Sequence, residues 1–390
     1  MKKLVPLLAI LGLLCAQTQA ASIITRGANS AYAYGFMKNK VASGYTGPGD
    51  IVSSATAWYG LRAYNGAYAA ATSKAVSLRR ASDNTTCDFN VATSGALGVS
   101  ASGCSAGTGL SLASFATTDA TCTGTAASST TLTVTGCSST PNVGSTITGT
   151  GFVQPVYATA VSVVAGSGTI TMSTAQTVTA ASTTLTYGLY VASWYDQTGS
   201  GNTVSQATAG NQPELLPSCG NSLPCVVFIS AKSTNLVFST FPSMAQPITA
   251  AAVAQESITA TVNNRIFESS TGPTSGNGGG ILRWNSSTVF YQYLFGSSIN
   301  LSTVTAGVLE SVIGTWNGTS SALAINNVST VAGIAPPTSW NAGLTLGAGT
   351  NFYSDVYEME LGIWPSAFNS TQITNMCHNQ YTYWATSVSC

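Results

Sequence analysis

Charged side chains are scarce in this chain, and their scarcity excludes several classes of function. Of the 390 residues only 6% are charged, the formal net charge is zero, and there is a single histidine, His378. No basic patch is available to neutralise phosphates, so nucleic-acid binding is disfavoured. One histidine and no Cys-x-x-Cys spacing make a metal site improbable. No Gly-x-Ser-x-Gly elbow accompanies His378, so a surface or helix-packing role is favoured over a catalytic triad.

Long apolar runs are also lacking beyond the first twenty residues. Lys2 and Lys3 precede an apolar run, Leu4 to Cys15, which is too short to span a bilayer stably. Small residues then lead up to Ala20, so residues 1–20 are interpreted as a signal peptide cleaved after Ala20. Bulky Leu14 before Cys15 argues against lipoprotein processing. We therefore expect a secreted, periplasmic or extracellular protein that does not associate with a membrane after signal cleavage.

Eight cysteines remain after residue 20, and an even number in an exported chain indicates disulfides. Pairing of neighbours along the chain is predicted, because each such pair closes a short local loop. The eight residues are Cys87, Cys104, Cys122, Cys137, Cys219, Cys225, Cys377 and Cys390.

Short segments rich in Thr, Val and Tyr, separated by Gly and Asn turns, predict an all-β protein. With 44% hydrophobic residues, the chain is not of the disordered class. Strand follows strand until a terminal segment that reads as a helix, with Asn369 or Ser370 as its N-cap, which favours a jelly-roll sandwich. Strands are expected near 75–80, 130–135, 167–172, 182–187, 225–229, 248–253, 289–295, 311–316 and 355–361.

Residues 119–187 differ from the rest because they contain no Lys, Arg or Glu and consist of Thr/Ser/Val strands. They separate two regions of similar composition, 21–118 and 188–390. We interpret 119–187 as a small β-rich insert, and a spacer or surface decoration is favoured over a catalytic role because loops tolerate insertions.

Several motifs carry a family resemblance. They are the segment Gly47–Ile51, then Arg62-Ala63-Tyr64, then Leu78–Asp83, and above all Trp194-Tyr195-Asp196-Gln197-Thr198-Gly199-Ser200-Gly201-Asn202. Together they resemble the catalytic domain of the α-L-arabinofuranosidase B family. The resemblance implies a concanavalin A-like, laminin-G-like jelly roll over 21–118 and 188–390. It also implies a retaining glycosidase that releases terminal arabinofuranosyl residues from a polysaccharide or oligosaccharide, with no cofactor.

Retaining chemistry needs two carboxyl groups roughly 5 Å apart. Glu268, at a strand end entering a Gly-rich loop, lies in the neighbourhood of the family's nucleophile, although it could instead align with a substrate-contacting aspartate. The acid/base should follow Leu346-Gly347-Ala348-Gly349, where this chain has Thr350-Asn351; Asp355 is the nearest carboxylate and serves only if the loop folds back. The candidates are the twelve acids Asp50, Asp83, Asp88, Asp119, Asp196, Glu214, Glu256, Glu268, Glu310, Asp355, Glu358 and Glu360.

Two departures from the family pattern bear more on activity than on fold. Asn264-Arg265 stands near the place of an adjacent cysteine pair that lines the family's sugar pocket, and Gly49 stands where the family has a disulfide cysteine. A second hypothesis is therefore kept: a non-catalytic glycan-binding or cell-surface or virion structural jelly roll that has lost the two carboxylates.

Substrate contacts are assigned to Asp196, Gln197, Trp284 and Asn351. For Asp196 and Gln197 a structural turn is the favoured alternative, because Asp accepts backbone N–H bonds and the following glycines supply positive φ. Most of the seven tryptophans are core candidates, with Trp284 and Trp340 nearest the loops of the candidate site. Glu358 and Glu360 alternate with apolar residues, which predicts that they are solvated strand residues.

Overall fold

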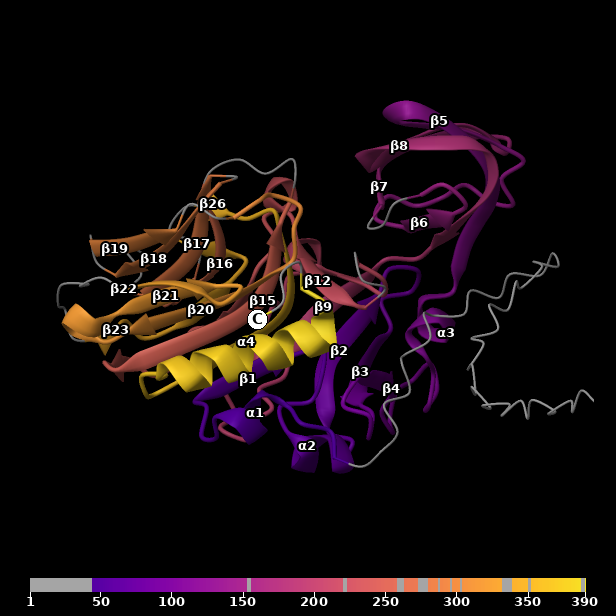
Figure 1. Cartoon of the computed structure of the whole chain (residues 1–390). Coiled ribbons are helices and arrows are strands. Elements are labelled where there is room, and N and C mark those ends of the chain that lie inside the picture. The colour runs from indigo at the N-terminus through magenta and orange to yellow at the C-terminus, as the bar shows by residue number, and fades with distance from the viewer. Residues whose placement is uncertain are drawn as a thin grey trace, which may run out of the picture. The chain divides into compact units, whose positions relative to one another are not determined.

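The chain folds mainly into antiparallel β-strands, as the sequence pattern predicts (Figure 1). The computed structural model describes residues 44–152, 156–219, 223–257, 263–272, 280–286, 288–294, 297–301, 304–331, 339–349, 352–386 and 390. The signal-peptide prediction and Asn351 lie outside these residues. In the part of the chain so described, no helix combines the length and apolar character needed to cross a membrane.

One large sheet of nineteen strands forms the jelly-roll sandwich. Its strands are β1 (Ala57–Gly60), β2 (Lys74–Arg80), β3 (Thr86–Val91), β4 (Leu97–Ser100), β9 (Leu189–Trp194), β10 (Val204–Ser205), β11 (Glu214–Leu216), β12 (Cys225–Phe228), β13 (Leu236–Phe238), β15 (Ile248–Glu256), β16 (Asn264–Glu268), β17 (Gly280–Ser286), β18 (Val289–Leu294), β19 (Ser297–Leu301), β20 (Glu310–Trp316), β21 (Ala322–Ile325), β22 (Val328–Val331), β24 (Leu344–Leu346) and β27 (Val356–Trp364).

Shorter elements complete the fold. Two small two-stranded antiparallel sheets join β14 (Met244–Ala245) to β23 (Ser339–Trp340) and β25 (Ala348–Gly349) to β26 (Phe352–Tyr353). The helices are α1 (Pro48–Ile51), α2 (Gly66–Ala70), α3 (Leu112–Ala116) and α4 (Ser370–Trp384), with 3-10 turns η1 (Ala209–Asn211), η2 (Ser230–Lys232) and η3 (Gly318–Ser320).

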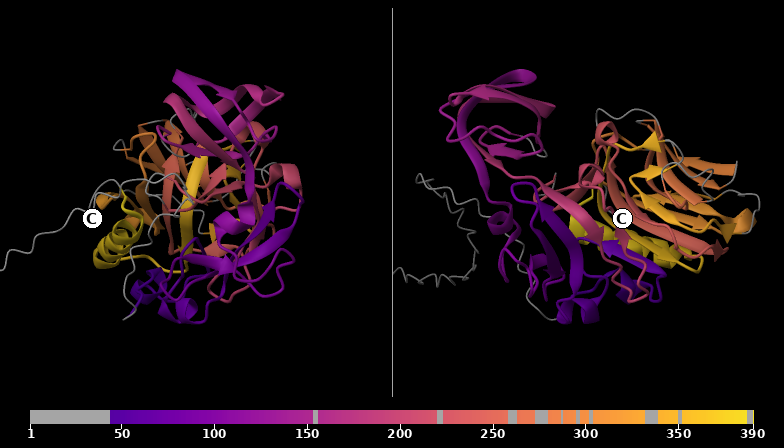
Figure 2. Two further views of the ribbon diagram at one scale, coloured as in Figure 1. Left: turned by 90° about the vertical axis from the view of Figure 1, so that its right-hand side faces the viewer. Right: turned by 180° about the vertical axis from the view of Figure 1, so that it is seen from behind.

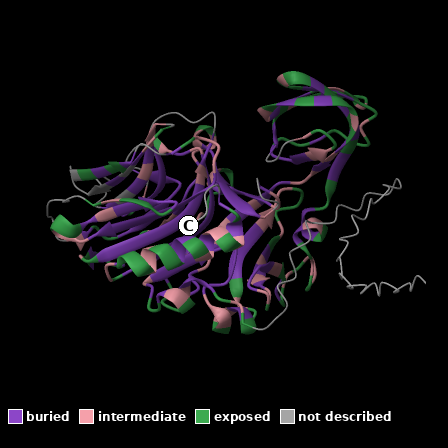
Figure 3. Ribbon diagram, in the orientation of Figure 1, coloured by how far each residue is buried: buried purple, intermediate pink, exposed green. Residues whose placement is uncertain are grey.

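Strand β27 lies at the centre of the sandwich and is buried along its whole length. It pairs with β1, β12 and β15, all antiparallel. Its apolar residues Leu361 and Ile363 belong to the main hydrophobic core, while Trp364 belongs to a second cluster that also contains Met376 and Cys377 of α4. Every residue of β27 is buried, so both faces of the strand are covered. Figure 3 shows that buried residues predominate along the strands of the large sheet.

Helix α4 begins as predicted, with Asn369 as its N-cap accepting a hydrogen bond from the Gln372 backbone N–H. It covers an outer face of the sheet. Trp384 Nε1 donates to Glu360 Oε2 at 2.6 Å, and Arg62 pairs with the same carboxylate. The prediction that Glu358 and Glu360 are solvated is therefore wrong, because both are fully buried.

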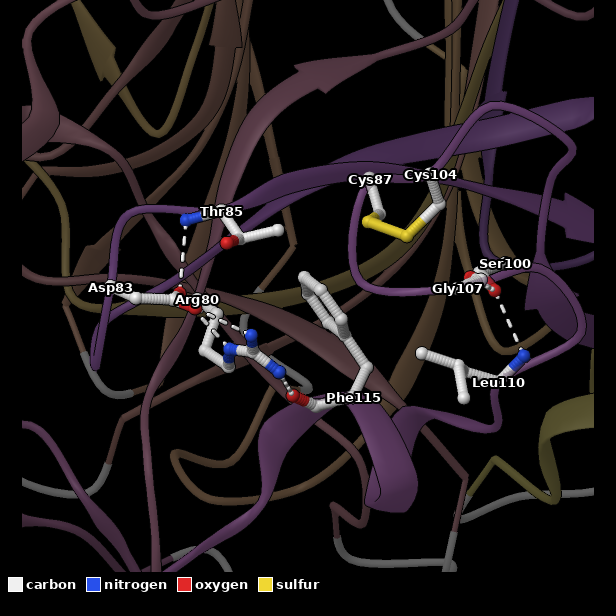
Figure 4. Close-up of a disulfide and its surroundings, with 9 residues drawn as sticks. All are labelled: Arg80, Asp83, Thr85, Cys87, Ser100, Cys104, Gly107, Leu110 and Phe115. Carbon is white, nitrogen blue, oxygen red and sulfur yellow. Dashed lines mark hydrogen bonds and ion pairs between the residues drawn. A yellow bond between two sulfur atoms is a disulfide. The ribbon is translucent and has the colours of Figure 1, made fainter.

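The four disulfides pair neighbouring cysteines, as predicted. The bridge between Cys87 and Cys104 fixes the segment after β3 (Figure 4). Close by, Arg80 pairs with Asp83 and donates from Nη1 to the carbonyl of Phe115 at 2.9 Å. These contacts attach α3 to the end of β2. The other three bridges are Cys122–Cys137, Cys219–Cys225 and Cys377–Cys390.

The Thr/Ser-rich segment forms a four-stranded sheet of its own, made of β5 (Thr118–Thr135), β6 (Thr146–Gly149), β7 (Ala158–Val164) and β8 (Ser167–Thr186) (Figure 2). In much of the long strands β5 and β8, buried residues alternate with exposed ones. The buried side chains, among them Leu132 and Ile170, make a separate hydrophobic cluster. Most of the apolar residues of this segment thus pack in a cluster of their own, while Tyr157 belongs to the main hydrophobic core of the sandwich.

Candidate active site

Glu268 is the last residue of β16 and has no exposed surface. Its neighbours across the sheet are Ile281 on β17 and Thr345 on β24. In a regular strand, residues three apart point to opposite faces. A bulge between Arg265 and Phe267 changes this, and Arg265 Nε lies 2.7 Å from Glu268 Oε2. The local irregularity therefore builds a buried ion pair.

The β25–β26 hairpin lies against this ion pair. A Cβ atom placed on Gly349 would collide with Glu268 Oε2 and would also lie 2.7 Å from Arg265 Cδ. Only glycine permits so close an approach of backbone to carboxylate. The Leu-Gly-x-Gly motif singled out in the sequence thus does meet Glu268, through Gly349.

The guanidinium of Arg265 is held from several sides. The ring of Phe352 on β26 stacks over it with 4.6 Å from Cζ to the ring centre, and this ring is 43% exposed. Burial lowers the pKa of Arg265, with repulsion from Arg283 acting in the same direction and Glu268 opposing both. The site therefore combines a carboxylate, two guanidinium groups and one exposed aromatic ring.

Asp355, the predicted acid/base, precedes β27 and is half-buried. Its carboxylate accepts two hydrogen bonds from Ser230, one from the backbone N–H at 2.9 Å and one from the hydroxyl at 2.7 Å. Asp355 therefore anchors the start of η2. Asp355 is linked to Glu268 only indirectly. The backbone N–H of Arg265, on the strand that ends at Glu268, donates to Oγ of Ser354, the residue before Asp355, at 2.7 Å.

A pair of buried glutamates that sequence reasoning did not select lies near the other end of β16. Asn264 Nδ2 donates to Glu256 Oε1 at 2.9 Å, and its Oδ1 accepts from the Asp355 backbone N–H. Burial raises the pKa of Glu256. Burial, reinforced by the charge of Glu256, raises the pKa of Glu310 to about 8. Asn264 thus connects the buried Glu256 to the Asp355 loop.

Two further glutamates are buried in the sandwich. Burial raises the pKa of Glu214 on β11 to about 8, and it raises the pKa of Glu358 on β27 well above its ordinary value. Burial disfavours the charged form of a carboxyl group, which is the cause of both shifts. Both are therefore suited to a structural role in a desolvated core.

Asp196 and Gln197 make the contacts of a structural turn. Asp196 accepts backbone hydrogen bonds from Trp58, Thr198 and Asn202. Gln197 accepts from the Tyr64 backbone N–H and donates to the carbonyls of Gly60, the last residue of β1, and Arg62. These contacts fasten the turn after β9 to the segment that follows β1. A role in sugar binding stays a prediction.

The remaining candidates do not line an open surface. Trp284 is fully buried and packs edge-on against Phe290 at 5.0 Å between ring centres, and Trp340 is buried against Trp316. His378 is exposed on α4. Within the described ranges, no group of three His, Cys, Asp or Glu side chains could hold a metal ion.

Comparison with known proteins gives a fold but no family. No family model matches the chain, and no curated protein matches it. Among solved structures, a GH54 α-L-arabinofuranosidase soaked with a cyclic sulfate inhibitor is similar, with a TM-score of 0.52. An arabinofuranosidase complexed with arabinofuranosyl-α-1,2-xylobiose gives 0.51.

Both of these alignments have 12% identity and cover 86% of this chain. The chain spans 64% of the length of each arabinofuranosidase. The likeness therefore shows a shared glycoside hydrolase-like β fold.

Proposed function

We propose that this protein is an exported glycoside hydrolase of the α-L-arabinofuranosidase type, which releases terminal arabinofuranosyl residues by a retaining mechanism. The observation that carries the proposal is the Glu268–Arg265 ion pair beneath the β25–β26 hairpin. It stands in a fold that resembles solved arabinofuranosidases, at the strand end where the sequence resemblance expects the nucleophile.

In this mechanism Glu268 attacks the anomeric carbon and forms a covalent glycosyl-enzyme, which water then hydrolyses. Arg265 orients the attacking carboxylate through its Nε, 2.7 Å from Oε2. Because Glu268 is fully buried against Gly349, this mechanism requires Gly349 to move away from the carboxylate before the sugar can reach it. Loops that open for substrate are a common part of enzyme cycles.

Asp355 is the proposed acid/base that protonates the leaving oxygen. For that role its two hydrogen bonds with Ser230 have to be exchanged for a contact with the substrate. The same motion offers this exchange, because β26 ends at Tyr353, two residues before Asp355.

The test is release of the aryl group from an aryl α-L-arabinofuranoside. We expect release by the wild type and a loss of at least about a thousandfold in Glu268→Gln, because a carboxamide cannot form the covalent intermediate. Asp355→Asn should lose rate with a changed pH profile. Glu214→Gln, another buried carboxyl, is the matched control and should retain activity. Equal rates in wild type and Glu268→Gln would exclude Glu268 as nucleophile.

A second function is supported by the same geometry: binding of a glycan without cleavage, as a lectin-like or structural jelly roll. The full burial of Glu268 and the capping role of Asp355 favour it. A folded wild-type protein that is retained on a polysaccharide column and releases no sugar over days would support this alternative.

A further inference from the structure

Two arginines stand directly opposite each other at the candidate site. Arg265 on β16 and Arg283 on β17 are cross-strand partners in the antiparallel pairing. Like charges directly opposite each other destabilise a sheet. The chain has only twelve Lys and Arg residues, so the placement of two of them directly opposite each other indicates a role in binding rather than in stability.

The heads of the two arginines converge on one residue. Asn263, just before β16, accepts from Arg283 Nη1 through its side-chain oxygen and from Arg265 Nη1, at 3.5 Å, through its backbone carbonyl. Asn263 has a φ of +69°, a left-handed conformation that asparagine tolerates better than most residues. The backbone is thus shaped so that both guanidinium groups gather at the entrance to β16.

The surroundings of this pair favour a glycan with a negative charge. Arg283 is half-buried, and the exposed ring of Phe352 lies over Arg265 beside it. Guanidinium groups bind carboxylates and sulfates through paired N–H donors, and partial burial strengthens such bonds. An aromatic ring supplies the flat apolar surface against which a sugar packs.

From this geometry we infer that the site recognises an acidic polysaccharide: the anionic group of a sugar next to the released residue binds the half-buried Arg283, and the buried Arg265 adds positive charge behind it, beside the exposed Phe352. The inference rests on the proposed function and narrows its substrate class. The shared chemistry is an anionic substituent on a sugar, either a uronic acid carboxylate or a sulfate ester.

The experiment compares matched polysaccharides. Binding of the whole protein is measured by calorimetry with an arabinosylated glucuronoxylan and with the same polymer after its carboxyl groups have been reduced to alcohols. A sulfated derivative of the reduced polymer forms the third arm. We expect affinity at least tenfold higher for the carboxylated or the sulfated polymer than for the reduced one, and this preference should weaken with added salt.

Arg283→Gln should remove most of that preference, and Arg283→Lys should restore part of it, since lysine keeps the charge but loses the fork geometry. The matched control is Arg79→Gln, a partly buried arginine on β2 bonded to Gln212 and Asn84, which changes net charge equally. Each variant is checked by its thermal melt, so that a folding defect is recognised.

Equal affinity of the wild type for all three polymers overturns the inference, and so does an equal loss in Arg283→Gln and Arg79→Gln. The proposed function is judged separately by sugar release from the neutral aryl substrate. If the protein releases sugar but does not prefer the acidic polymers, the proposed hydrolase function is retained and the anion site is rejected. If the protein prefers the acidic polymers but releases no sugar, the anion site is retained and the hydrolase function is rejected.

Discussion

At the scale of single residues, the sandwich is unusual in its buried glutamates. Glu310 is 2% exposed, and its raised pKa of about 8 means that the folded protein holds the neutral acid at neutral pH. In the unfolded chain the same group ionises near pH 4.3. The folded form therefore binds the proton more tightly than the unfolded form.

The consequence is a stability that declines with rising pH. The contribution of Glu310 is fully present below its unfolded pKa and is lost as pH rises through about 8. Between pH 5 and 8 one such group changes the free energy of unfolding by about 1.4 kcal/mol per pH unit. Glu310→Gln, which mimics the neutral acid, should flatten this slope in denaturant titrations at several pH values.

Exposed Asp83 provides the control for this titration, since its hydrogen bonds with Arg80 hold its pKa well below the ordinary range. Asp83→Asn should leave the slope between pH 5 and 8 unchanged. A Glu310→Gln protein with the wild-type slope would show that Glu310 is ionised in the folded state.

The burial of these acids also shows where reasoning from sequence ended. Alternation of Glu358 and Glu360 with apolar residues was read as a solvated face, but a pattern of period two cannot distinguish water from a covering helix. The Arg265–Glu268 pair was missed for a related reason. Residues three apart on a strand face apart, and the bulge that brings them together has no sequence signature here.

At the scale of elements, the sequence was informative. Strands were expected at nine places, and all nine lie in strands of the structure, because runs of β-branched residues between glycine turns signal strands directly. The expected strands 167–172 and 182–187 are, however, parts of the single long strand β8. The N-cap of α4 and the pairing of neighbouring cysteines were also predicted correctly. The position of α4 could not be predicted, since it depends on contacts such as that of Trp384 with a distant strand.

Helix α4 is attached to the sheet through the Glu360 carboxylate. Trp384→Phe keeps the aromatic packing but removes the N–H that donates to this buried acceptor. We expect a loss of about 1.5–3 kcal/mol in the free energy of unfolding, the cost of losing a hydrogen bond to a charged group. Denaturant titration measures it. His378→Ala, on the exposed side of the same helix, should change stability by less than about 0.5 kcal/mol.

At the scale of the whole molecule, the four-stranded sheet of β5 to β8 begins and ends at one place. Thr118 and Thr186 are partners in the β5–β8 pairing. Their Cα atoms are therefore about 5 Å apart, as in any antiparallel pair. The insert has its own hydrophobic cluster, its own disulfide and a buried Asp119 that binds Asn142 and Ser145.

This arrangement makes the insert removable. Replacing residues 119–185 by Asn-Gly, the preferred two-residue turn between antiparallel strands, should leave the sandwich folded. We expect a melting temperature within a few degrees of the wild type and unchanged sugar release or binding. Failure of the shortened chain to fold would show that the sandwich depends on the insert, and retention of fold with loss of glycan binding would assign the binding to it.

The pairing of each cysteine with its neighbour has a consequence for biosynthesis. Eight cysteines permit 105 connectivities. In this protein, however, the first, third, fifth and seventh of these cysteines each pair with the next cysteine along the chain. The paired cysteines are 17, 15, 6 and 13 residues apart. An oxidase that joins thiols in order of their emergence therefore produces the native set without correction. We therefore expect the reduced chain to regain its native disulfides without an isomerase, because each thiol's partner is the nearest one along the sequence.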